Sequence, residues 1–138
     1  MKNFLKKYFD DFRSLIISSE EIVSDLLLVK AVIASASENG KKSIIVGNGG
    51  SAAMASHFSV DVTKNAGIRC INFNESDLIT CFSNDYGYEH WVEKAVEFYG
   101  DEGDVFIGIS SSGSSENIQN GCHAARKKDF SKIITLSG

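Results

Sequence analysis

His57 and Asp61 lie four residues apart and are the side chains of this sequence best suited to acid–base chemistry. In a helix, this spacing places an imidazole and a carboxylate one above the other on the same face. Such a pair can act as a general base with its partner, or can supply two ligands to a divalent metal. From the spacing alone, an ordinary surface ion pair is the more frequent outcome.

A glycine-rich turn precedes this pair, in the stretch GNGGSAAMASHF over residues 47–58. Free backbone N–H groups at such a turn, together with the positive end of the following helix, attract anions. The turn has no lysine and therefore lacks the P-loop pattern GxxxxGK[ST]. Gly47-x-Gly49-x-x-Ala52 matches the looser dinucleotide pattern, but Glu75 is poorly placed as its ribose-binding acid. A tight turn without any ligand stays an alternative.

A second loop of the same kind, SSSGSS, covers residues 110–115 and also lies between an apolar run and helical sequence. We expect the two loops to form two walls of one phosphate pocket. Neither loop contains lysine or arginine, so backbone amides and hydroxyl groups would hold the phosphate. For this loop by itself, a flexible surface linker is the alternative.

The sequence NDYG over residues 84–87 lies in a polar break between two predicted helices. Asp85 is its candidate functional side chain, as a contact to a sugar hydroxyl. A turn stabilised by hydrogen bonds from its own Asn and Asp side chains is the alternative.

Four short apolar runs, with helical sequence between them, must position these residues. They cover residues 43–46, 68–73, 105–109 and 133–136, and the helices between them are expected over 52–64, 76–82, 88–99 and 116–128. Strands that alternate with helices predict an α/β fold with a doubly wound parallel sheet, whose strands are buried on both faces. In such sheets, ligands bind at the carboxyl ends of the strands, where the strand order reverses.

The first forty residues are predicted to be one long helix or two successive helices that end at Gly40. Their apolar face either packs on the protein's own core or contacts a second subunit. We therefore divide the chain into an N-terminal helical segment, residues 1–40, and a ligand-binding domain, residues 41–138. The apolar face includes Phe4, Leu5, Tyr8, Phe9, Phe12, Leu15 and Ile16.

The composition is that of a globular protein, with 138 residues, 43% hydrophobic and 23% charged. A net charge of -4 and the lack of a basic patch argue against nucleic acid as a ligand. Three widely spaced cysteines, Cys70, Cys81 and Cys122, fit reduced thiols in or near the core. No segment has the length of a membrane span or the pattern of a signal peptide, so we expect a cytoplasmic protein.

The motifs together resemble a known family. GNGGSAAMASHF is followed in order by NDYGYE, by GDVFIGIS with SSGSSENI, and by ITLSG. This series resembles the sugar isomerase (SIS) domain, and most of all the phosphoheptose isomerases, which convert sedoheptulose 7-phosphate to D-glycero-D-manno-heptose 7-phosphate for lipopolysaccharide or capsule heptose. The resemblance implies a five-stranded parallel sheet of flavodoxin-like order, and usually a homotetramer in which the N-terminal helices help to build the interface.

The resemblance also implies roles for individual residues. Asp85 would position the substrate, and His57 and Asp61 would flank the reacting carbons, with Asp61 as the catalytic base. In some family members the corresponding pair binds zinc, so Zn²⁺ is a predicted but not required cofactor here. Phosphate contacts are implied for Ser51, Ser110, Ser111, Ser112 and Ser115, and sugar contacts for Asn48 and Gly49.

Two departures from the family pattern affect the expected activity. The family has glutamate where this chain has Asp61, and the missing methylene would displace the base by about 1 Å. The family also continues after the fourth strand into a fifth strand and a helix with a Q-x-x-x-H element, whose histidine is the partner acid or base. We therefore expect the domain to be incomplete at its C-terminus and the 138-residue chain to bind better than it catalyses.

The sequence as a whole predicts a ketose–aldose isomerase that acts on a phosphorylated sugar through an enediol. The alternative hypothesis is a non-catalytic SIS module that binds a phosphosugar or a protein partner as a regulator.

Overall fold

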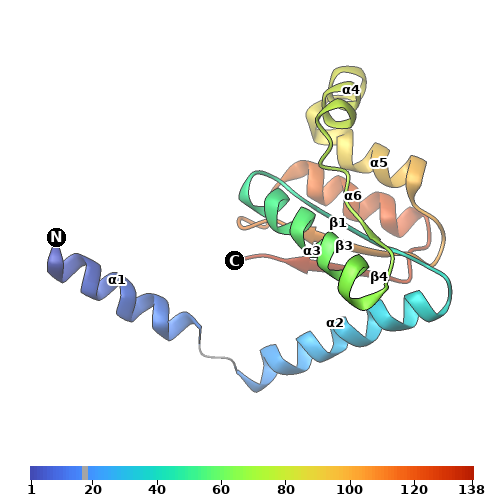
Figure 1. Ribbon diagram of the computed structural model, residues 1–138. Helices are drawn as coiled ribbons and strands as arrows, with labels where there is room; N and C mark the ends of the chain where they lie inside the picture. The colour runs from blue at the N-terminus through green and yellow to red at the C-terminus, as the bar shows by residue number, and fades with distance from the viewer. Residues whose placement is uncertain (17–18) are drawn as a thin grey trace. The chain divides into compact units, whose positions relative to one another are not determined.

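A four-stranded parallel sheet forms the centre of the computed structural model, which describes residues 1–16 and 19–138 (Figure 1). The strands lie in the order β2-β1-β3-β4, which is the flavodoxin-like order predicted for the first four strands. Their bounds are β1 (Ser43–Gly47), β2 (Cys70–Ile71), β3 (Val105–Ile109) and β4 (Lys132–Leu136). The helices are α1 (Lys2–Leu15), α2 (Glu20–Glu38), α3 (Gly50–Ala66), α4 (Ser76–Tyr86), η1 (Tyr88–His90), α5 (Trp91–Tyr99) and α6 (Glu116–Lys127).

The chain forms two compact units, Met1–Lys30 and Ala31–Gly138. The first contains α1 and the beginning of α2, and its large apolar side chains are exposed, among them Phe4 and Phe9. The second contains the end of α2, the sheet and all the other helices. No helix among the described residues is both long enough and apolar enough to span a lipid bilayer.

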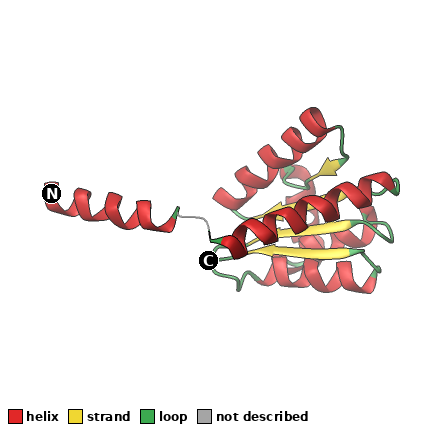
Figure 2. Ribbon diagram, turned by 90° about the horizontal axis from the view of Figure 1, so that it is seen from below, coloured by secondary structure: helices red, strands yellow, loops and turns green. Residues whose placement is uncertain are grey.

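The sheet buries apolar side chains on both faces because successive residues of a strand point to opposite sides. Ile44, Val46 and Phe106 belong to the main core, which α5 and α6 cover on one face. Ile45 and Ile107 are equally buried and point to the opposite face, where α3 lies. Figure 2 shows the strands enclosed between these helical layers. The predicted α/β fold is therefore confirmed.

The register of β1 against β3 brings the candidate loops to one edge of the sheet. The two strands pair in parallel from Ser43↔Val105 to Gly47↔Ile109, so they end at the same level. The strand order reverses between them, because the chain crosses from β1 to β2 on one side and from β3 to β4 on the other. This reversal creates the crevice where ligands of doubly wound proteins bind.

Two strands differ from the prediction. Hydrogen-bonded pairing in β2 is limited to Cys70 and Ile71, although the apolar run suggested residues 68–73. After Ile71, Asn72 and Asn74 turn their side chains to α3, where the Asn72 amide donates to Ser59 Oγ and the Asn74 amide to Ala52 O. The other strand, β4, lies at the end of the strand order and is half-buried to exposed rather than buried on both faces.

The break predicted at residues 84–87 is shorter than its polar sequence suggested. Asn84, Asp85 and Tyr86 form the last turn of α4, and the helix ends at Gly87, which has a φ of 92°. The aromatic ring of Tyr86 packs edge-on against Phe82, which extends the helix by one turn.

The predicted placement of the cysteines in or near the core is wrong for one of them. Cys81 is exposed, while Cys70 is buried and Cys122 is partly buried.

Candidate active site

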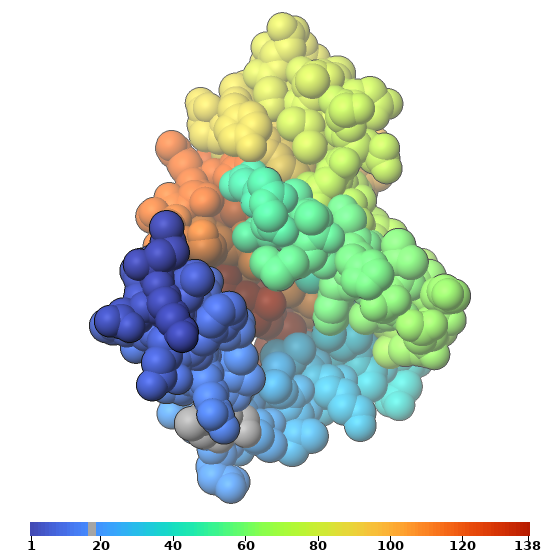
Figure 3. Space-filling model, turned by 60° about the vertical axis from the view of Figure 1, so that its left-hand side comes forward, coloured from blue at the N-terminus to red at the C-terminus, as the bar shows by residue number. Residues whose placement is uncertain are grey.

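The glycine-rich turn and the serine loop meet at the carboxyl edge of β1 and β3, as the sequence predicted. Figure 3 shows this region, with the beginning of α3 in aquamarine, the loop before α6 in orange and the end of the chain in dark red. A direct hydrogen-bonded contact joins the two segments, from Asn48 in the first to Asn117 at the start of α6. The two loops therefore lie at the same edge of the sheet, and the first is bonded to the helix that follows the second.

Glycine is needed at positions 47 and 49 of the first loop for two different structural reasons. Gly47 ends β1, and a Cβ atom there would lie 2.7 Å from the backbone carbon of Ser51, closer than any side chain tolerates. Gly49 has a φ of 53° and precedes α3, whose N-terminal amides Ser51 N and Ala52 N turn back to the carbonyl of Asn48. This close return places the Ser51 side chain and the start of α3 directly above the end of β1.

Replacing Gly47 with alanine should destabilise the protein by about 1–3 kcal/mol, because the new methyl group forces the loop away from the strand. Gly50 is the matched control, since a Cβ at that position meets no atom within 4 Å and its φ is not positive. Urea unfolding of both variants measures the difference. Equal stability of Gly47→Ala and Gly50→Ala would contradict the geometry described for this turn.

The serine loop is organised by hydrogen bonds between its own hydroxyl groups. Ser110 Oγ donates to Ser115 Oγ over 3.0 Å, and Ser112 Oγ accepts from the amide and the hydroxyl of Ser114. Within the described residues, Ser115 makes no side-chain cap to α6, and the amide of Ile118 donates to Ser115 O, so an anion would bind to the amides that precede Ile118. A cavity of about 110 Å³ lies beside the loop, lined in part by Ser110, Gly113 and Ser137.

Asn48 belongs to a network of three side chains that the sequence did not indicate. Its Nδ2 donates to Asn117 Oδ1 over 2.9 Å, and its Oδ1 accepts from Asn117 Nδ2 over 2.8 Å. The hydroxyl of Tyr88, in η1, donates to the same Asn48 oxygen over 3.0 Å. These bonds connect three crossover segments at the carboxyl edge, and Asn117 is buried among them with 3% of its surface exposed.

His57 and Asp61 lie on one face of α3, with His57 Nε2 3.4 Å from Asp61 Oδ2. Their side chains are 81% and 51% exposed, and Asp61 accepts a further hydrogen bond from Asn65 one turn later. The contacts of this pair thus run along its own helix, which confirms the predicted spacing. The described contacts link neither side chain to the serine loop.

Metal binding by this pair would need additional ligands. Among residues 1–16 and 19–138, no three His, Cys, Asp or Glu side chains are grouped as a metal ion requires. Zinc sites use three or four protein ligands, whereas His57 and Asp61 supply two. The two residues therefore do not fit a zinc site by themselves, and we derive no reaction step through a metal.

Asp85 lies in the last turn of α4, where it is exposed. One of its oxygens accepts from the Asn84 amide over 2.9 Å, and the other lies 3.8 Å from the thiol of Cys81. The following segment leads directly to Tyr88, which contacts Asn48. The NDYG sequence is therefore linked to the glycine-rich turn through the hydrogen bond of Tyr88 to Asn48. Asp85 itself has only local partners among the described contacts.

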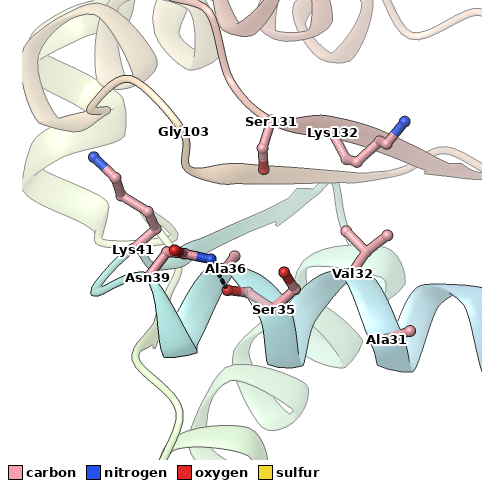
Figure 4. A pocket seen from close by; sticks show the side chains of 9 residues that line it. All are labelled: Ala31, Val32, Ser35, Ala36, Asn39, Lys41, Gly103, Ser131 and Lys132. Carbon is pink, nitrogen blue, oxygen red and sulfur yellow. Dashed lines mark hydrogen bonds between the residues drawn. The ribbon is translucent and has the colours of Figure 1, made fainter.

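A larger cavity of about 480 Å³ lies at the opposite edge of the sheet (Figure 4). The end of α2 forms one wall, and the other is formed by Gly103, Ser131 and Lys132, which lie just before or at the beginning of β3 and β4. Asn39 donates to Ser35 O within it over 2.8 Å, and the side chains of Lys41 and Lys132 extend away from each other. This cavity contains none of the predicted site residues.

Comparison with known proteins gives a consistent result. A family model described as the SIS domain matches residues 7–138. The phosphoheptose isomerase of Fusobacterium nucleatum is 37% identical over 97% of this chain and 73% of its own length. That of Proteus mirabilis is 41% identical over 78% of this chain and 58% of its own length. This chain spans between 58% and 73% of the length of these relatives.

Solved structures agree with the sequence relatives. Phosphoheptose isomerase GmhA from Neisseria gonorrhoeae superimposes with a TM-score of 0.87 at 28% identity, over 99% of this chain and 75% of that one. A phosphoheptose isomerase from Francisella tularensis gives a TM-score of 0.89 at 26% identity, over 99% of this chain and 74% of that one.

Proposed function

Since the chain belongs to the SIS domain family, we propose that it is a sugar-phosphate isomerase that converts sedoheptulose 7-phosphate to D-glycero-D-manno-heptose 7-phosphate. The observation that carries the proposal is the hydrogen-bonded junction of the glycine-rich turn with the first turn of α6, directly after the serine loop, through Asn48 and Asn117. The names of its relatives support the same activity. The product would serve the synthesis of lipopolysaccharide or capsule heptose.

The phosphate binds to the serine loop and to the beginnings of α3 and α6. Hydroxyl groups and backbone amides hold it, with no lysine or arginine in either loop. The residues in this role are Ser51, Ser110, Ser111, Ser112 and Ser115. Asn48 and Gly49 then face the sugar, and Asp85 positions its hydroxyl groups.

The reaction moves a proton between neighbouring carbons of the open-chain sugar. Asp61 removes a proton from the carbon next to the ketone, and the ketone oxygen takes up a proton from water as the enediol forms. The proton on Asp61 then returns to the former carbonyl carbon, and the hydroxyl of the other carbon releases its proton to water to give the aldehyde. His57, with Nε2 3.4 Å from Asp61 Oδ2, orients the carboxylate.

Incubation of the full-length protein with sedoheptulose 7-phosphate tests the proposal. The expected result is an aldose phosphate, detected by chromatography or by exchange of the transferred hydrogen with solvent deuterium. Zinc bound by His57 and Asp61 would require a further ligand, so the reaction is run with added zinc and with a chelator. Absence of aldose under both conditions would refute the isomerase.

A non-catalytic phosphosugar-binding regulator is the second candidate. It is favoured by the exposure of His57 and Asp61 and by the short Asp61 side chain. The same incubation separates the two functions, because the regulator binds sedoheptulose 7-phosphate in calorimetry without forming aldose.

We further propose that the protein is a cytoplasmic homotetramer assembled through its N-terminal helices. The apolar face of α1 supports this, with Phe4 66%, Phe9 63% and Leu15 80% exposed. Association would remove these side chains from water, which is the main driving force of subunit assembly.

The variant Phe9→Glu should dissociate the tetramer, because a buried carboxylate opposes association. Asn3→Glu adds the same charge to a polar residue of the same helix and should leave the assembly intact. Light scattering after size exclusion measures the mass against 15.0 kDa for one chain. A wild-type monomer, or a Phe9→Glu variant of unchanged mass, would contradict the proposed interface.

A further inference from the structure

The side-chain amides of Asn48 and Asn117 each have a fixed orientation, in which the positions of oxygen and nitrogen cannot be exchanged. The backbone N–H of Ile118 is shared between Ser115 O, at 3.0 Å, and Asn117 Oδ1, at 3.1 Å. A backbone N–H can only donate, so the Asn117 atom that faces it must be the oxygen rather than the nitrogen. Asn117 is therefore held in one of its two amide orientations by the third residue of α6.

This orientation determines that of Asn48. Asn117 Oδ1 accepts from Asn48 Nδ2 over 2.9 Å, and Asn117 Nδ2 donates to Asn48 Oδ1 over 2.8 Å. If Asn48 were turned over, two oxygens and two nitrogens would face each other. The hydroxyl of Tyr88 adds a second donor to Asn48 Oδ1, at 3.0 Å.

The network leaves Asn48 with a free hydrogen-bond donor but no free acceptor. A carboxamide oxygen has two lone pairs, and here Asn117 and Tyr88 occupy both. The amide nitrogen has two hydrogens, of which one is bonded to Asn117. The other N–H is directed away from the pair, so Asn48 can offer a ligand a donor but no acceptor.

We propose that Asn117 and Tyr88 are positioning residues that hold Asn48 as an obligatory hydrogen-bond donor to an oxygen of the bound sugar. The inference rests on the proposed function for the identity of the ligand. Asn48 directly follows β1 within the glycine-rich turn, and the proposed function assigns its free N–H to the sugar rather than to the phosphate. A carbonyl oxygen matches this donor best, since it can only accept.

Tyr88→Phe is the main test, because it removes the hydroxyl donor and keeps the aromatic ring on a side chain that is already 54% exposed. Calorimetry with sedoheptulose 7-phosphate should show binding weakened by up to about tenfold, because Asn48 loses one of the two partners that hold its amide oxygen and that oxygen is then free to face the ligand. Binding of inorganic phosphate should change by less than about twofold, since the phosphate loops are untouched. Tyr99→Phe is the matched control, with a ring that is 50% exposed in α5.

Asn117→Ala tests the other half of the network. In that background Tyr88→Phe should have little further effect on sugar phosphate binding, because Asn48 is no longer held in one orientation. Asn117 is buried, so if this variant fails to fold, the comparison of Tyr88→Phe with Tyr99→Phe decides. Equal affinities of these two tyrosine variants for sedoheptulose 7-phosphate would overturn the inference.

A second measurement is independent of catalysis and of the sugar. In ¹⁵N-labelled protein, the side-chain NH₂ signals of Asn48 should shift in Tyr88→Phe and stay unchanged in Tyr99→Phe. Wild-type protein that binds no sedoheptulose 7-phosphate would refute the proposed function. The NH₂ signals would still show whether Tyr88 holds the side-chain amide of Asn48 in the orientation described. Signals of Asn48 that do not respond to Tyr88→Phe would overturn the inference.

Discussion

Replacing Asp61 with asparagine is expected to lower the rate of isomerisation by about 10²–10⁴-fold, the usual contribution of a general base. Asparagine keeps the shape of the side chain but cannot accept the proton from carbon. Affinity for sedoheptulose 7-phosphate should stay nearly unchanged, because the phosphate loops and Asn48 are intact. Turnover by mass spectrometry and binding by calorimetry measure the two effects separately.

Asp129→Asn is the matched control for this substitution. Asp129 is exposed, has a φ of 55° that asparagine also tolerates, and lies at the opposite edge of the sheet, where its carbonyl accepts from Gly103 N. It should leave both turnover and binding unchanged. Wild-type turnover by Asp61→Asn would show that another group is the base.

Asp61→Glu should have the opposite effect and raise turnover by up to about a hundredfold. The added methylene restores the reach of the glutamate found in the family and carries the carboxylate closer to the sugar. Because Asp61 is 51% exposed, the longer side chain has room on the helix surface. A lower rate in Asp61→Glu would show that the site of this protein is shaped for aspartate.

The arrangement of the loops could be predicted from sequence because it depends on local signals. Residues 43–46 and 105–109 are short apolar runs, and parallel strands of equal length end at one edge. Glycine and serine after each run then predict a helix N-terminus with open amides. These features predict the two loops, whereas the adjacency of β1 and β3, which brings Ser51 and Ser110 to one edge, depends on the strand order.

The Asn48 network could not be predicted because its members are far apart in the sequence. Asn48 and Asn117 are separated by 69 residues, and Asn48 and Tyr88 by 40. An asparagine at the second position of a helix is also common as a surface residue, so Asn117 gave no sign of its burial. The end of α4 was missed for a related reason, since the packing of Phe82 against Tyr86 outweighs the polar character of residues 84–85.

A buried carboxylate at the amino edge of the sheet was likewise not apparent from the sequence. Asp104 is fully buried just before β3 and accepts hydrogen bonds from Lys42 N at 3.0 Å and Asp101 N at 2.9 Å. Lys42 Nζ lies 2.5 Å from Asp104 and 2.6 Å from Asp101. Asp104 therefore fastens the beginnings of β1 and β3 together, which keeps their opposite ends in register at the candidate site.

Asp104→Asn should destabilise the protein by about 3–5 kcal/mol, the usual result of removing one partner of a buried ion pair. An amide cannot replace the carboxylate, because its nitrogen faces the donors on Lys42 and Asp101. Asp101→Asn is the matched control, since the Asp101 side chain is 75% exposed and an exposed ion pair contributes little to stability. Urea unfolding at pH 7 measures both, and equal losses would contradict the assigned role of Asp104.

The pH dependence of stability provides a second test of the same ion pair. Partial burial lowers the pKa of Lys42, but hydrogen bonds to Asp101 and Asp104 raise it more, so the net pKa lies above its ordinary value of 10.5. A raised pKa in the folded state means that the contribution is complete below pH 10.5 and is lost as the pH rises through the folded-state value. The difference in unfolding free energy between wild type and Asp104→Asn should therefore be constant near neutrality and shrink in strong alkali. A difference that stays constant through that alkaline range would mean that Lys42 does not stabilise the protein through its charge.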